Sequence, residues 1–174
     1  MLTLSTRKGL HNVERCIDAA FVVHPDFKSH TGATQHFVGG KGAVQSISAK
    51  QKLNTSSSTT SELVGVDQML PMASWTPLFV EAQGHCIEEN KAWQDNQSTM
   101  SLEKNGKTIS GKRARALNTR HFMTTDQVGH GDCTIQCCPT DDMVGNFVTK
   151  GLQGVKFATF RKKIMGMQEH FKMQ

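Results

Sequence analysis

Tyrosine is absent from this 174-residue chain, and aromatic residues together make up only 6% of it. Long apolar runs are missing as well. The longest, at residues 19–23, is far shorter than the ~20 residues that a membrane-spanning helix needs. Residues 1–9 contain no apolar core of a secretory signal. These absences argue against a membrane protein and favour an intracellular one, cytoplasmic or nuclear, that is not secreted.

The five cysteines are odd in number and contain no CxxC pair, which favours a reduced protein without disulfides. One possible metal-binding set consists of His130, Cys133, Cys137 and Cys138, but its spacing matches no common zinc pattern. We therefore favour ordinary buried cysteines over zinc. Neither a phosphate-binding loop, a GxGxxG fingerprint nor a GxSxG elbow is present, so no motif supports nucleotide binding or a serine triad.

The net charge of +5 is unevenly distributed. Basic residues gather at 112–120 and again at 161–163. Clustered basic groups suit a polyanion such as nucleic acid, although a short basic run is more often a solvated helix face. If the chain binds a duplex, we expect phosphate contacts from Lys112, Arg113, Arg115 and Arg120.

The length fits one domain, residues 1–174, with a core at about 13–150 and a helical tail at 151–174. The chain begins with three candidate strands, and Gly39 and Gly40 supply a hairpin turn that favours an antiparallel meander. Strands are expected at 16–23, 31–38, 42–47, 85–94 and 133–138, and helices at 60–83, 97–104, 113–128 and 157–167. Pro71 and Pro77 should kink or break the first helix. This order predicts an α/β fold: a mixed sheet of three antiparallel strands followed by strand–helix units, with flanking helices.

Three carboxylates stand where a charge needs an explanation. Asp18 interrupts an apolar strand, Glu62 lies near a helix start, and Asp95 follows a strand. Each also has an ordinary interpretation: Asp18 is solvated at a strand edge, Glu62 forms a capping box with Thr59, and Asp95 is an N-cap. Together, however, they can meet at one end of the sheet. Such oxygen ligands suit Mg²⁺ or Mn²⁺, and metal pairs of this kind support phosphodiester hydrolysis.

Many short stretches, in order along nearly the whole chain, resemble the ribonuclease H domain of copia-type retrotransposon polyproteins. Among them are the Q-D-N-Q-S segment at 94–98 and the T-K-x-L-Q-G segment at 149–154. The others lie at residues 17–26, 28–33, 50–55, 57–59 with 62–65, 81–84, 102–106, 138–140 and 160–161.

This resemblance implies a ribonuclease H-like fold, cleavage of RNA in RNA–DNA hybrids, and four acidic metal ligands. Asp18, Glu62 and Asp95 match three of them. The fourth acidic position is occupied here by Asn146, which we expect to face the other three from a late helix. Because an amide lacks charge, we expect Mg²⁺ or Mn²⁺ to be held weakly at one of two sites.

Other departures from the family pattern, at Thr60, Pro77 and Gly151, favour a degenerate copy. The family's domain is normally fused to a reverse transcriptase, which this sequence does not contain. Two functions follow as hypotheses. One is a retroelement ribonuclease H impaired by the loss of the fourth acidic ligand. The other is a non-catalytic nucleic-acid-binding remnant or a pseudogene product.

Overall fold

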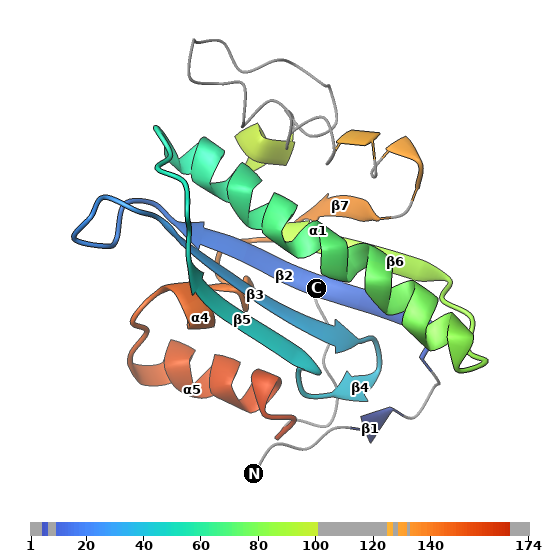
Figure 1. Cartoon of the computed structure of the whole chain (residues 1–174). Helices are drawn as coiled ribbons and strands as arrows, with labels where there is room; N and C mark the ends of the chain where they lie inside the picture. Colours follow the sequence, from blue (N-terminus) through green and yellow to red (C-terminus); the bar gives the residue numbers. More distant parts are fainter. Residues whose placement is uncertain (1–4, 7–9, 101–124, 127–128, 132, 168–174) are drawn as a thin grey trace.

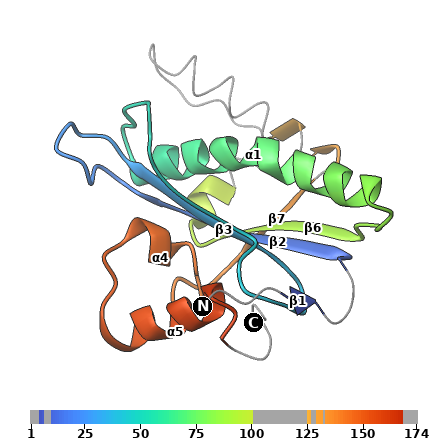
Figure 2. The same cartoon turned by 60° about the horizontal axis from the view of Figure 1, so that its bottom comes forward.

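A long helix covers one face of a five-stranded sheet, and two shorter helices cover the other, as the computed structural model shows in two views (Figures 1 and 2). The structure describes residues 5–6, 10–100, 125–126, 129–131 and 133–167. The four basic residues Lys112, Arg113, Arg115 and Arg120 lie outside the described residues, and so does the expected helix at 113–128 apart from a few residues at its end. Among the described residues, no helix is long and apolar enough to cross a membrane.

The sheet begins with the expected antiparallel meander of β2 (Asn12–Ala20), β3 (His30–Phe37) and β5 (Gln45–Lys50). The strand order is β5-β3-β2-β6-β7, and β6 (Glu89–Gln94) and β7 (Thr134–Cys137) continue it in parallel to β2. Gly39 and Gly42, with φ of +74° and +75°, turn the chain between β3 and β5. Between them β4 (Gly40–Lys41) pairs with β1 (Ser5–Thr6), so β5 starts later than the sequence predicted.

The two faces of the sheet carry separate apolar clusters. Ile17, Ala33 and Ile135 pack under α1 (Ser58–Ala82) with Val66 and Met69. On the opposite face, the buried cluster consists of Cys16, Cys138, Met143, Val144 and Phe160. Phe160 comes from α5 (Gly154–Ile164), and residues around α4 (Asn146–Thr149) pack there too. The C-terminal helix is thus part of the core packing, because it closes the second face.

The expected break in the long helix is not found, since α1 continues through both Pro71 and Pro77 to Ala82. Pro77 has no N–H to donate to the carbonyl of Ala73, one turn earlier. That carbonyl instead accepts a hydrogen bond of 3.0 Å from Nδ2 of Asn90 on β6. A side chain of the sheet therefore replaces the hydrogen bond that proline removes.

The helix start also differs from the prediction. Ser57 is the N-cap, and it forms a reciprocal capping box with Thr60, not the box between Thr59 and Glu62 that the pattern allowed. Glu62 consequently lies one turn into the helix with only 5% of its surface exposed. Capping does not explain this carboxylate.

A buried histidine makes the fold sensitive to acid. His36 on β3 is 1% exposed and lies 3.8 Å from the sulfur of Cys16. Burial, aided by the positive charges of Arg15 and Lys163, lowers the pKa of His36 to about 3. Its unfolded pKa is about 6.5, so the unfolded state binds the extra proton between these values. Stability is therefore full above pH ~6.5 and falls as the pH drops towards 3.

We expect this single group to remove about 1.4 kcal/mol of unfolding free energy per pH unit below pH ~6.5. Urea denaturation of His36→Gln between pH 7 and 4 should show a shallower loss than the wild type. The exposed His85 offers a matched control, and His85→Gln should keep the wild-type slope. Equal slopes for the wild type and His36→Gln would contradict this assignment.

Candidate metal centre

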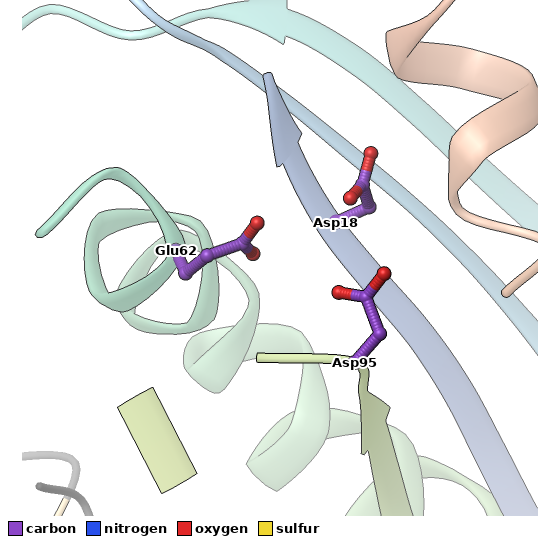
Figure 3. Close-up of side chains that lie close together, drawn as sticks. All are labelled: Asp18, Glu62 and Asp95. Atoms are coloured by element: carbon purple, nitrogen blue, oxygen red, sulfur yellow. The ribbon is translucent and has the colours of Figure 1, made fainter. Parts of the chain in front are cut away.

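Asp18, Glu62 and Asp95 point towards one another from three different elements (Figure 3). Asp18 lies near the end of β2, Glu62 near the start of α1, and Asp95 directly after β6. One carboxylate oxygen from each lies within 4.8 Å of the other two. The expected convergence of these three carboxylates at one end of the sheet is therefore found.

Strand register explains how residues so far apart in sequence meet. β2 and β6 are parallel, and Cys16 pairs with Trp93. Asp18 and Asp95 each come two residues after this pair, so they lie side by side on the same face. Asp95 is not the N-cap of the helix that follows, because Asn96 accepts the hydrogen bond from the amide of Thr99 at 3.2 Å. The ordinary interpretation of Asp95 is thereby removed.

The environment of Glu62 is that of a buried carboxyl among like charges. Burial is the main cause that raises its pKa to about 9, and the negative charge of Asp18 adds to it. The amide of Ala19 and the ammonium of Lys150 act in the opposite direction. In the metal-free protein Glu62 therefore carries a proton at neutral pH, and it must lose that proton to ligate a cation.

The donor set fits a hard divalent cation. Carboxylate oxygens are the ligands of Mg²⁺ and Mn²⁺, and the geometry brings three of them together. Oε2 of Glu62 is buried without a hydrogen-bond partner, as expected for an atom that a bound cation would satisfy. Among the described residues this is the one cluster of three or more potential metal-ligating side chains, so His130 and the three late cysteines form no such group.

Asn146 begins α4, on the side of the sheet opposite α1, and is 2% exposed. Its Nδ2 donates to the carbonyl of Thr140 at 3.0 Å, which directs Oδ1 the other way. Oδ1 accepts a hydrogen bond from Nζ of Lys150, which also lies 3.3 Å from Oδ1 of Asp18. Asn146 is thus joined to the carboxylate cluster through a lysine.

Two side chains at the end of α4 contact Asp18 directly, and neither contact was predicted from the sequence. Thr149 donates a hydrogen bond from Oγ1 to Oδ2 of Asp18, and the ammonium of Lys150 donates one to Oδ1. Gly32, the β3 partner of Asp18, makes this approach possible. A Cβ at Gly32 would lie 2.4 Å from Cγ2 of Thr149, which is too close for any side chain. The T-K dipeptide at 149–150 was visible in the sequence, but only as part of a motif.

An open cavity of about 450 Å³ reaches Thr149 and Lys150, the two side chains that contact Asp18, although none of the three carboxylates lines it. Lys150 and Thr149 line it together with His24, His30 and Ser48. His24 Nε2 and His30 Nδ1 are 3.0 Å apart, and the other nitrogen of His30 lies 2.8 Å from the hydroxyl of Ser48. Hydrogen-bond donors and a cation therefore border the space next to the metal centre.

No family model matches the chain. The fold is similar to solved ribonuclease H domains. One is the ribonuclease H1 isolated from compost by a metagenomic approach, with a TM-score of 0.57 at 8% identity over 79% of this chain and 92% of that chain. Another is the enzyme from Halobacterium salinarum, with 0.51 at 16% identity over 74% and 86%.

The third comparison is with the foamy viral protease-reverse transcriptase in complex with an RNA/DNA hybrid. Its TM-score is 0.54 at 10% identity over 92% of this chain and 20% of that chain. At these identities the similarity establishes the fold alone. The chain has the ribonuclease H-like fold, with a mixed five-stranded sheet and helices on both faces, as the sequence predicted.

Proposed function

We propose that this protein is a metal-dependent ribonuclease H that cleaves RNA in RNA–DNA hybrids, with activity reduced by Asn146. The observation that carries the proposal is the meeting of Asp18, Glu62 and Asp95 within 4.8 Å, on three separate elements of a ribonuclease H-like fold. Solved structures of this fold include complexes with RNA/DNA hybrid. The sequence motifs favour a copia-type retroelement as its source.

In this proposal the three carboxylates hold Mg²⁺ or Mn²⁺. A cation bound there would activate water for attack on a phosphodiester. Asp18 is oriented by Thr149 and Lys150, each taking one carboxylate oxygen. Glu62 would release its proton to solvent on binding a cation, and Asp95 would supply the third oxygen.

Substrate phosphates have two sets of candidate contacts. One set consists of His24, His30, Ser48 and Lys150, which border the cavity, and it is joined to the site by the contact of Lys150 with Asp18. Lys112, Arg113, Arg115 and Arg120, outside the described residues, would hold the duplex by its backbone and not by base edges. Both sets of contacts suit a nucleic acid that is bound through its phosphates, whatever its base sequence.

A hybrid-cleavage assay tests the proposal. With Mn²⁺ or Mg²⁺, the wild type should release RNA fragments slowly from an RNA–DNA hybrid and leave a DNA duplex intact. Asp18→Asn should lower the rate by about 100-fold or more, because it removes a charge that the cation needs. The protein should come from a host that lacks its own ribonucleases H, so that residual cleavage belongs to this chain.

Asp26→Asn is the matched control. Asp26 is half-exposed and pairs with Lys50 at 2.7 Å, outside the carboxylate cluster, so its loss should leave the rate unchanged. Equal rates in Asp18→Asn and the wild type would refute the proposed site.

The second candidate function, non-catalytic binding, is favoured by one observation. The fourth position of the site holds a neutral amide whose oxygen already contacts Lys150. Hybrid binding that weakens steeply as salt rises, without cleavage under any metal condition, would identify this function instead.

A further inference from the structure

The ammonium of Lys150 lies at the edge of the carboxylate site, in contact with Asp18. Its side chain is 44% exposed, whereas that of Asp18 is 2% exposed. The lysine therefore reaches inwards from the rim to a buried carboxylate. It spans Oδ1 of Asp18, 3.3 Å away, and Oδ1 of Asn146, one helical turn before it in sequence.

Both oxygens that Lys150 contacts are potential metal ligands. The amide of Asn146 cannot offer its oxygen elsewhere while Nδ2 is held by the carbonyl of Thr140. Asp18 has its other oxygen taken by Thr149. A divalent cation on this side of the site would therefore need the atoms that the ammonium already uses, and two cations cannot share them at contact distance.

The electrostatic influence of Lys150 extends across the cluster. The Asp18 carboxylate that Lys150 contacts has an oxygen within 4.8 Å of oxygens of Glu62 and Asp95. Where an acidic residue would add a fourth negative charge, Asn146 adds none. The remaining carboxylates are thus partly balanced by a cation that belongs to the chain itself.

Resting on the proposed function, we infer that Lys150 is an internal counter-cation that competes with a divalent metal ion for the Asp18–Asn146 side of the site. The metal-free protein is stabilised by this lysine, and a metal ion binds there only after displacing it. The side chain has space to leave, since it borders both solvent and the cavity with His24 and His30. The cost of displacement lowers the apparent affinity for metal.

Calorimetric titration with Mn²⁺ alone, without nucleic acid, tests this inference. Lys150→Met keeps the length of the side chain and removes its charge, so Mn²⁺ affinity should rise by about five- to tenfold. Lys150→Arg keeps the charge and should bind Mn²⁺ as weakly as the wild type. Lys50→Met is the matched control, because Lys50 is 46% exposed and paired with Asp26, and its removal should change affinity little.

Thermal melting gives a second measurement. Without metal, Lys150→Met should melt below the wild type, because the buried carboxylate of Asp18 then loses the ammonium that pairs with it. Added Mn²⁺ should raise its melting temperature more than that of the wild type. Unchanged or weaker Mn²⁺ binding in a folded Lys150→Met, or the same gain in Lys50→Met, would overturn the inference.

These outcomes separate the inference from the proposed function. Tighter Mn²⁺ binding in Lys150→Met without any hybrid cleavage would support the internal cation and refute the nuclease. Cleavage that depends on Asp18, together with unchanged Mn²⁺ binding in Lys150→Met, would do the reverse.

Discussion

Asn146→Asp should raise the rate of hybrid cleavage with Mg²⁺ by about 100-fold. Asn146 is buried beside Lys150 at the start of α4, where the amide oxygen contributes a dipole but no charge. A carboxylate there brings the ionised cluster from three negative charges to four, which balances two divalent cations. Mg²⁺ sheds its water reluctantly, so it should gain more than Mn²⁺ from the added charge. Single-turnover cleavage of one hybrid with each metal measures the effect.

Asn54→Asp is the control for a charge added elsewhere, because Asn54 is exposed in the segment before α1. It should leave the rate unchanged. Asp18→Asn in the Asn146→Asp background should abolish the gain. Equal Mg²⁺-dependent rates for the wild type and Asn146→Asp would mean that the fourth ligand lies at another position.

The carboxylate cluster was predictable in part. Glu62 and Asp95 stand at boundaries of the expected elements, whereas Asp18 was expected inside a strand at 16–23 that in fact ends at Ala20. Asp18 and Asp95 both come at the carboxyl ends of strands, and such ends meet at one edge when the strands are parallel. That β2 and β6 are neighbours and parallel, with Cys16 opposite Trp93, was not evident from either strand alone. Register depends on packing across the whole sheet, so local pattern could place the residues only approximately.

Glu62 shows how a correct local rule can apply to the wrong residue. The segment before α1 is rich in serine and threonine, and several of its members could cap a helix. The helix begins at the first suitable pair, Ser57 with Thr60, which frees Glu62 from that role. Lys150 was missed for a different reason. A lysine four residues after Asn146 indicates a neighbour on a helix face, but only the close approach at Gly32 brings that face to Asp18.

Arg15 lay outside the strand that the sequence predicted, yet it is completely buried in β2. Its guanidinium donates to Gln35 at 2.8 Å, to Asn90, and to the carbonyl of Met72 at 3.5 Å. Burial lowers the pKa of Arg15 to about 10, so it stays charged at neutral pH. The polar groups beneath the C-terminal half of α1 therefore form one connected network. Asn90 links the guanidinium of Arg15 to the carbonyl of Ala73, which has no backbone donor because residue 77 is proline.

Asn90→Ala should destabilise the protein by about 3 kcal/mol, because it leaves both the Ala73 carbonyl and part of a buried guanidinium without partners. The unfolding free energy from urea denaturation at neutral pH measures this loss. The exposed Asn54 again provides the control, and Asn54→Ala should change stability by less than about 0.5 kcal/mol.

A double-mutant cycle with Pro77→Ala identifies the cause. Alanine at position 77 restores the backbone N–H, which can donate to the Ala73 carbonyl and so take over the role of Asn90. In the Pro77→Ala background, Asn90→Ala should therefore cost roughly 1 kcal/mol less than in the wild type. The remaining cost belongs to Arg15, whose contact with Asn90 is lost in either background. Costs that are equal in the two backgrounds would show that Asn90 does not compensate for the proline, and that α1 tolerates Pro77 by other means.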